Sequence, residues 1–504
     1  MLTLRERSAL LVLPLVFLIA ELLLRHHGLP YWLWFNLDPS YTYLIGGLNI
    51  LQHAPPAQFQ HPGVPVLLVA AAAWFTPAAD RLKDAETILT RASDAMLVFD
   101  AAMLWLLGKC IRRRADTLLP ALFAQLAPFI TMLTLKHGIE VEPEPLLLGA
   151  VALLVATMVE DAVMPRTASL FGMAFAVAFG AACKTTFAPL GLAPLIVMRG
   201  VGRRIAYIVL VAVLFALWMV PEIPNLAPMI AWFTALTKGS GAYGHEPQTV
   251  VAWAAYPHDF AKLFFARPLF LAAFAAGIVA LIAGRRDTPG ARLLLALLTA
   301  QLVQIALVAK HPSGHYILPA LELAGPVLGL AWFVATESGW LSPRLIGQLG
   351  GAALAIIVIA QAIAFAGQDA EMRSRAAAAQ SIDLARDLPR CAHVYEFMAS
   401  APSAAWFYND SFSGQRYAAQ LKALMPPNDY FAEPWRAPIE NWDGPVAAST
   451  VAQKYPCIAL RSAEPNAVDD LAKQFGARFA QAVRCRAGDE DILVAGAACP
   501  AVKP

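Results

Sequence analysis

Residues 345–366 read LIGQLGGAALAIIVIAQAIAFA and contain no charged side chain. An α-helix rises about 1.5 Å per residue, so a run of about 20 apolar residues can cross the hydrocarbon core of a bilayer. The chain before this run consists mainly of similar apolar segments, whereas the chain after it is polar, with charges throughout. The run therefore predicts the last crossing of a membrane domain, residues 1–367, followed by a polar domain, residues 368–504.

The composition of the whole chain also indicates a membrane protein. Hydrophobic residues make up 58% of the 504 positions and charged residues 15%, and the mean hydropathy is +0.55. A soluble globular chain has about 45–50% apolar and about 25% charged residues. The net charge is only +2, and no basic run is interleaved with aromatic residues, so we expect no nucleic-acid partner.

The apolar segments predict a polytopic α-helical membrane protein with about ten to thirteen helices, because only helices or closed barrels satisfy the backbone in lipid. Residues 63–77 are apolar but short and flanked by prolines, so we expect them to be re-entrant or to cross only in part. The expected crossings are 8–24, 92–108, 117–135, 145–161, 204–221, 267–284, 291–309, 314–335 and 345–366, with a broken pair, 167–182 and 186–198, interrupted at Lys184.

Basic clusters set the expected orientation, because cytoplasmic loops are enriched in Lys and Arg. The first cluster precedes an apolar run that resembles a signal peptide, but no small-residue cleavage site follows, so we expect a retained helix. The clusters expected in the cytoplasm are Arg5 with Arg7, Lys109 with Arg112 to Arg114, Arg199 with Arg203 and Arg204, and Arg285 and Arg286 with Arg292. The segments then left on the outer side are 136–144, 222–266, 310–316 and the chain after 367.

The polar domain shows the pattern of a small soluble α/β domain. The runs CAHVYEF (391–397), CIALR (457–461) and DILVAG (491–496) resemble strands, and residues 466–474 resemble a helix. Four of the six cysteines fall in this domain, which suits one or two disulfides in an oxidising compartment. Four cysteines allow three pairings, and four free thiols are the alternative. These cysteines are Cys391, Cys457, Cys485 and Cys499.

Two candidate functional residues follow the first expected helix. Asp38, in WFNLDPSYTYL (34–44), could act as a general base, or it could cap the helix that begins near Pro39. His61, in QFQHPGVP (58–65), could bind an anionic headgroup or move a proton. The alternative is an ordinary histidine in an interfacial loop.

An acidic segment, LKHGIEVEPEPLLL (135–148), lies between two expected helices. We expect Pro143 and Pro145 to prevent a helix here, so that alternate carboxylates point the same way. Carboxylates so close repel, which raises the pKa of at least one unless a cation or a metal is near. A solvated acidic loop is the alternative. The candidate residues are His137, Glu140, Glu142 and Glu144.

Cationic residues gather in a second outer segment, AKHPSGHYILPAL (309–321), and would suit a phosphate ester. Pro312 and Gly314 argue against the helix that a histidine metal site would need. Lys184, within GAACKTTFAPL (180–190), could face inward as a cation for a lipid phosphate, or its amine could extend to the membrane surface. The candidates in the second segment are Lys310, His311, His315 and Tyr316.

In this order the segments resemble the GT-C superfamily of polyprenyl-phosphate-sugar-dependent glycosyltransferases, near the protein O-mannosyltransferase and lipid A aminoarabinose transferase group. The similar elements are an acid after the first helix, a His-Pro element, an acidic outer loop, a lysine-centred broken pair and a late His-Tyr-leucine-proline element. The resemblance covers roughly residues 1–370, and departs from the family pattern where Gly63 replaces a proline and where Glu140, Glu142 and Glu144 compete for the single acid.

The resemblance implies a GT-C-like fold and transfer of a sugar from a polyprenyl phosphate to a glycan, lipid or protein acceptor, with inversion. The site would face the periplasm of a bacterial inner membrane. No cofactor is implied, and a divalent metal is left open. Asp38 would be the base, Glu142 or Glu144 would orient a substrate, and the phosphate would meet His61, Lys184, Lys310, His315 and Tyr316. The sugar pocket would include His137, Tyr243 and His245. Tyr243 and His245 lie in the outer segment 222–266 and could equally be ordinary interfacial residues.

Two other classes of function remain. A transporter or flippase of lipid-linked intermediates would need ionisable residues along a path through the membrane. A non-catalytic membrane scaffold would act through its outer domain. The donor sugar, the acceptor, the lipid length and the oligomeric state are left open by the sequence.

Overall fold

The computed structural model describes residues 3–33, 40–58, 60, 63–75, 82–239, 250–284, 288–339, 343–433, 438–464 and 466–500. These residues form two compact units. The first comprises Met1–Leu22, Phe59–Val69 and Ser93–Gly367, and the second comprises Leu23–Gln58, Ala70–Ala92 and Gln368–Pro504. One boundary, after Gly367, coincides with the change in composition, and the division into 1–367 and 368–504 stays a prediction.

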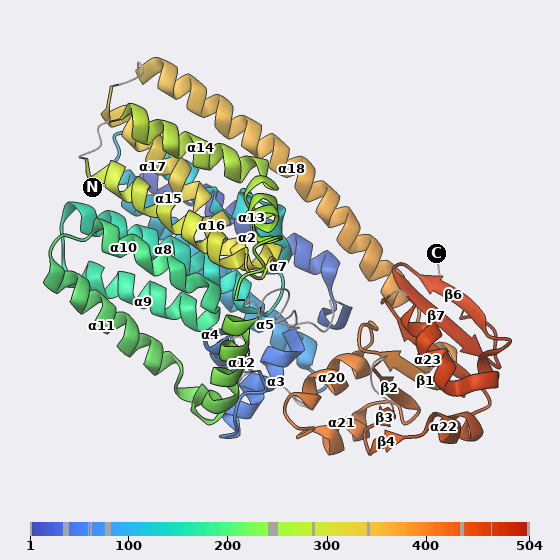
Figure 1. Cartoon of the computed structure of the whole chain (residues 1–504). Helices are drawn as coiled ribbons and strands as arrows, with labels where there is room; N and C mark the ends of the chain where they lie inside the picture. Colours follow the sequence, from blue (N-terminus) through green and yellow to red (C-terminus); the bar gives the residue numbers. More distant parts are fainter. Residues whose placement is uncertain are drawn as a thin grey trace. The chain divides into compact units, whose positions relative to one another are not determined.

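The multi-pass helical membrane protein that the sequence predicts is confirmed. Among the described residues, six helical segments are long and apolar enough to cross a bilayer. A seventh is a pair of helices, α13 (Tyr256–Phe265) and α14 (Pro268–Ala283), that bends by 90° at its break. The longest helix, α18 (Pro343–Ser381), contains the run with which the sequence analysis began (Figure 1). The six segments are Leu4–Gly28, Pro143–Val163, Val201–Trp218, Pro289–Val308, Gly314–Glu337 and Gly347–Asp387.

Breaks in the helices explain part of the difference from ten to thirteen, while α5 (Ala85–Arg112) is unbroken but carries several charged side chains. Proline interrupts two expected crossings, because its ring and its missing N–H disturb the helix interior. The short helix expected in 63–77 is α4 (Val64–Ala73), which at about 1.5 Å per residue is about half the length of a span. Expected crossing 117–135 is α6 (Leu119–Gln125), η2 (Ala127–Phe129) and α7 (Met132–Gly138), and 186–198 is η3 (Thr185–Gly191) and α10 (Leu192–Val197).

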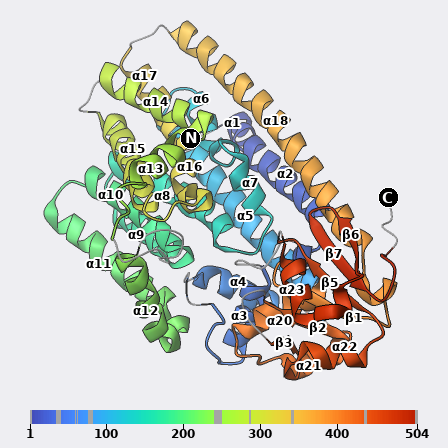
Figure 2. The ribbon, with the colours of Figure 1, turned by 45° about the vertical axis from the view of Figure 1, so that its right-hand side comes forward.

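Helix α9 (Thr167–Cys183) lies between α8 (Pro143–Val163) and α11 (Val201–Trp218) in the first unit (Figures 1 and 2). The two flanking helices differ in what covers them. The most apolar stretch of α8 is 72% buried inside the protein, whereas that of α11 is 6% buried. Helix α11 therefore presents its apolar side chains to lipid, and α8 belongs to the core that holds the site described below.

The second unit contains a seven-stranded mixed sheet in the order β4-β3-β2-β1-β5-β7-β6. The central strand β1 pairs in parallel with β2 and β5, and the other neighbouring strands are antiparallel. The three expected strands and the expected helix, α23 (Ala467–Phe475), are confirmed. The strands are β1 (Ala392–Glu396), β2 (Asp429–Ala432), β3 (Ile439–Asn441), β4 (Gly444–Val446), β5 (Ile458–Ser462), β6 (Val483–Ala487) and β7 (Glu490–Ala495).

Both faces of this sheet are covered, because successive side chains of a strand point to opposite faces. Val394 packs with α22 (Ala448–Lys454) and α23, and its neighbour Tyr395 packs on the other face with α20 (Pro402–Ser411). In β2, Tyr430 likewise packs with α22 and α23, and its neighbour Phe431 packs on the other face with α20. Covered strands carry few polar positions, which is why these runs looked strand-like in the sequence.

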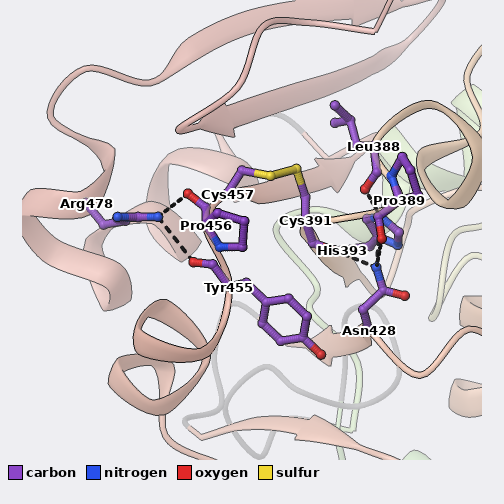
Figure 3. The surroundings of a disulfide bond; sticks show 9 residues. All are labelled: Leu388, Pro389, Cys391, His393, Asn428, Tyr455, Pro456, Cys457 and Arg478. Atoms are coloured by element: carbon purple, nitrogen blue, oxygen red, sulfur yellow. Dashed lines mark hydrogen bonds between the residues drawn. A yellow bond between two sulfur atoms is a disulfide. The ribbon is translucent and has the colours of Figure 1, made fainter.

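Two disulfides connect the four cysteines of this domain. Cys391 bonds to Cys457, joining the starts of the parallel strands β1 and β5, and Cys485 bonds to Cys499. Around the first bond, the Arg478 guanidinium donates to the carbonyl oxygens of Tyr455 and Pro456 (Figure 3). The two remaining cysteines, Cys110 and Cys183, are free and buried.

Candidate functional site

Three breaks between helices of the first unit bring charged and polar side chains together. His137 lies in the last turn of α7, and Glu142 and Glu144 lie at the start of α8. Lys184 lies between α9 and η3. The remaining members, His315 and Tyr316, lie in η6 (Gly314–Ile317). We call these six residues the polar cluster.

The prediction that Pro143 and Pro145 prevent a helix is wrong. Helix α8 begins at Pro143, where proline is tolerated because the N–H that it lacks would have no partner in the first turn. Glu142 is the extended residue before the helix, and Glu144 lies in its first turn. Both carboxylates therefore lie at the positive end of a helix dipole, which favours negative charge.

Glu144 and Lys184 form an ion pair in which each side chain is only 2% exposed. Lys184 has an extended backbone that ends α9, so its side chain leaves the helix axis and turns inward. Its amine also lies over the Tyr316 ring, 4.8 Å from the ring centre. A buried lysine needs such partners, since an unpaired charge in a low dielectric is costly.

The Gln304 side chain links η3, which follows Lys184, to η6, which contains Tyr316. The Gln304 amide nitrogen donates to the carbonyl oxygen of Thr186 at 2.9 Å and to that of Tyr316 at 3.2 Å. Gln304 is fully buried on α15 (Pro289–Val308). The amide therefore fixes η3 and η6 side by side, and with them Lys184 and Tyr316.

His137, Glu142 and His315 form the other part of the polar cluster. His137 Nδ1 lies 2.5 Å from Glu142 Oε1, and the His137 and His315 ring centres are 5.7 Å apart. Ser313 Oγ lies 2.9 Å from His315 Nδ1. Burial raises the pKa of Glu142, and the Glu144 carboxylate raises it further. Burial alone would lower the pKa of His137, but the Glu142 and Glu144 carboxylates together outweigh burial and raise that pKa.

The cluster adjoins a large apolar cavity of about 690 Å³. Tyr316, Thr185 and Thr186 belong to its lining, so one part of the wall is shared with the cluster or lies directly beside Lys184. Most of the remaining wall is apolar. Its side chains come from η3, α10, α11 and the residue after it, α15 and α12 (Leu226–Lys238), and they include Pro189, Leu192, Phe215, Met219, Met229, Trp232, Phe233, Leu236, Val303 and Leu307.

This arrangement can bind an amphiphile that has an anionic head. Cationic groups near the cluster attract a phosphate, and the apolar cavity removes a hydrocarbon chain from water. The carboxylates beside the cations can accept hydrogen bonds from hydroxyl groups. Among the described residues, Glu144 Oε2 is buried without a hydrogen-bond partner, so one strong acceptor is left within the cluster.

Lys310 does not join the polar cluster in the part of the chain that the structure describes. Its amine donates to the carbonyl oxygens of Leu236 and Thr237, at 2.7 and 2.8 Å. These carbonyls belong to the last turn of α12. The phosphate contact of Lys310 stays a prediction, and among the described residues its amine contacts a helix end.

Four expected site residues lie outside the described residues, namely Asp38, His61, Tyr243 and His245. Their roles stay predictions. Within the described ranges, no group of three or more His, Cys, Asp or Glu side chains could hold a metal ion. The metal requirement stays open.

The structure adds two buried carboxyl groups that our sequence analysis missed, Asp100 and Glu322. Glu322 is fully buried, and neither of its carboxyl oxygens has a hydrogen-bond partner among the described residues. Asp100 Oδ1 accepts from the Gly149 backbone nitrogen at 3.0 Å. A carboxyl group inside an expected apolar crossing was the signal for both. The apolar cavity residues gave no such signal, because they look like any other membrane-helix side chains.

Comparisons with known proteins do not establish a family. No family model matches the chain, and no curated protein matches it. Among solved structures, the chain is similar to ArnT from Cupriavidus metallidurans in a crystal structure bound to undecaprenyl phosphate. The match covers 95% of this chain and 97% of that chain, with 13% identity and a TM-score of 0.47. A likeness at this identity and score carries no argument about activity.

Proposed function

We propose that this protein is a membrane glycosyltransferase that moves a sugar from a polyprenyl-phosphate donor to an acceptor. The observation that carries the proposal is the junction of the polar cluster with the 690 Å³ apolar cavity at Tyr316. A polyprenyl phosphate has the matching chemistry, with one anionic group at the end of a long hydrocarbon chain. The cavity would hold the first isoprene units, and the cluster would hold the phosphate and the sugar.

The phosphate would lie beside Lys184 and His315. In the reaction, an acceptor oxygen or nitrogen bonds to the anomeric carbon while the bond from that carbon to the phosphate oxygen breaks. The leaving oxygen keeps the electron pair, so nearby cations stabilise the negative charge that develops on it. Attack from the face opposite the phosphate inverts the anomeric configuration.

The acceptor would be activated by a carboxylate. Asp38 is the proposed general base that takes the acceptor proton, as the sequence resemblance implies. Glu142, held by His137, would orient the acceptor or the sugar, because its second oxygen can accept a hydroxyl hydrogen bond. Glu144 would hold Lys184 in place and offer its other oxygen to the sugar.

The proposed location is the outer leaflet of a bacterial inner membrane, with the cluster and the disulfide-bonded domain on the periplasmic side. Two observations support this orientation. The basic clusters of the sequence would stay in the cytoplasm. Two disulfides in the second unit suit an oxidising compartment.

The test is sugar transfer from a radiolabelled pool of polyprenyl-phosphate sugars in proteoliposomes. We expect transfer by the wild-type protein and a loss of about 10²–10⁴-fold in Asp38→Asn, the range for removal of a general base. Asp259→Asn, on α13, is the matched control and should transfer normally. Unchanged transfer by Asp38→Asn would show that Asp38 only caps a helix.

A transporter of lipid-linked intermediates is the second candidate, and Asp100 and Glu322 favour it. Both carboxyls are buried in the helical bundle, as residues along a transport path would be. The same proteoliposomes separate the two functions. Movement of the labelled lipid across the bilayer without sugar transfer would replace the glycosyltransferase by the transporter.

A further inference from the structure

Helix α12 forms one wall of the apolar cavity, and most of its side chains are exposed or only half-buried. Met229, Trp232, Phe233 and Leu236 line the cavity, yet Met229 is the only buried residue in the helix. On its outward side, Ile230 is 60% exposed. A helix that lines a cavity and has few buried apolar contacts is held weakly by its own side chains.

The end of α12 is held instead by cationic residues from another segment. The last carbonyls of any helix lack partners within the helix. Lys310 Nζ donates to two of them, those of Leu236 and Thr237, and His311 Nε2 lies 3.1 Å from the Leu236 oxygen. A cation at this end also complements the negative end of the helix dipole.

The segment that holds α12 continues into the polar cluster. Three residues after Lys310 comes Ser313, which contacts His315, and Tyr316 lies over the Lys184 amine. His311 and Tyr316 both line the cavity. The segment 310–316 therefore contacts α12, the cavity and the polar cluster, where a phosphate would bind.

We propose that α12 is a wall that opens to admit and release a long lipid chain, and that Lys310 is the positioning residue that holds it closed. The inference rests on the proposed function for the class of ligand, a polyprenyl phosphate. It assigns Lys310 to the chain and not to the phosphate. A long chain extends beyond the cavity and must pass α12, whereas a chain of two isoprene units ends within the cavity and leaves without displacing that wall.

The test compares two lipids on the full-length protein in nanodiscs, a C55 polyprenyl phosphate and geranyl phosphate, both radiolabelled. In Lys310→Met, we expect the dissociation rate of the C55 lipid to rise about tenfold, the factor of one weakened contact, and that of geranyl phosphate to stay the same. Lys310→Arg keeps donors for the carbonyls and should restore slow dissociation. Lys238→Met removes an exposed cation from the same helix end and should have no effect.

Amide hydrogen exchange gives a second readout that does not depend on turnover. We expect faster exchange in 226–238 for Lys310→Met, and slower exchange in the wild type when the C55 lipid is bound. Equal weakening of both lipids would overturn the proposal and make Lys310 a phosphate contact. Unchanged dissociation and exchange would also overturn it. Failure of the wild type to bind either lipid would instead remove the proposed donor class.

Discussion

Two buried ion pairs among the described residues, one in each unit, differ in how fully their hydrogen bonds are satisfied. In the second unit, Arg461 pairs with Glu490 and also donates to the carbonyl oxygens of Ala379 and Ile382, both at 3.1 Å. The other Glu490 oxygen accepts from the Ser400 backbone nitrogen at 2.8 Å. Every oxygen of that carboxylate therefore has a protein partner.

The pair in the first unit is incomplete by comparison. Lys184 and Glu144 are equally buried, but Glu144 Oε2 has no hydrogen-bond partner among the described residues. A buried polar atom without a partner costs free energy, so a native structure keeps one where it has a use. The Arg461 pair is complete within the second unit, whereas we propose that the Lys184 pair leaves the second Glu144 oxygen to bind a ligand.

Among the variants that test this comparison, Lys184→Met should have the largest effect. Sugar transfer should fall by about 10²–10³-fold, because a group that stabilises the leaving phosphate is lost. The Glu144 charge would also be left buried and unpaired, which costs about 3–5 kcal/mol. Initial rates and thermal unfolding of the purified protein measure the two effects.

The double variant Lys184→Met with Glu144→Gln separates these two causes. It removes both charges, so the midpoint of thermal unfolding should return toward the wild-type value, while transfer should stay lost. If the double variant transferred sugar at the wild-type rate, the Lys184 pair would be structural like the Arg461 pair, and the comparison would fail.

Arg461→Met should act on stability alone. Removing one partner of this buried pair should lower the free energy of unfolding of the second unit by about 3–5 kcal/mol. Amide exchange in β5 and β7 would measure it, since both strands contain a partner of the pair. Molecules that remain folded should transfer sugar at the normal rate per molecule, and Arg484→Met, at an exposed ion pair, is the control.

The smallest effect that we expect is a change with pH in the free energy of unfolding of the second unit. Burial raises the pKa of Glu396 from 4.5 to about 7, although Ser462 Oγ and the Met398 backbone nitrogen donate to its Oε2. Between these two pH values the folded chain keeps a proton that the unfolded chain has lost. The free energy of unfolding should therefore fall as the pH rises through this window.

Glu396→Gln removes this titration. The difference between its thermal midpoints at pH 5 and pH 7.5 should be smaller than that of the wild type. An equal pH dependence in the two proteins would show that other groups control the stability of this unit.

The sequence predicted a break between helices at Lys184, and it offered an inward cation as one of two interpretations, because a lysine between apolar runs is unusual in lipid. It also predicted β1 and β5 from their apolar, β-branched and aromatic residues. It misjudged Pro143, since the same residue that disrupts a helix interior is favoured at the first helical position. It missed β3 and β4, which are three residues each and have little pattern to detect.

Lys310 shows a second limit of what the sequence could predict. A lysine and two histidines in six residues have the chemistry of a phosphate site, and the sequence assigned them as one group. In the structure His315 turns to the polar cluster, whereas Lys310 turns to the end of α12. Which way each side chain turns depends on the carbonyl groups of a helix more than 70 residues away.

The sequence by itself indicated that this protein enters a membrane through several helices, that the helical pattern breaks at Lys184, and that a small α/β domain with four cysteines follows. These properties depend on runs of neighbouring residues, whose hydropathy and backbone preferences act locally. Only the tertiary structure decided that the breaks meet, that Glu144 pairs with Lys184, and that a cavity lies beside them. Such contacts join residues far apart in the chain, and they depend on how whole helices pack.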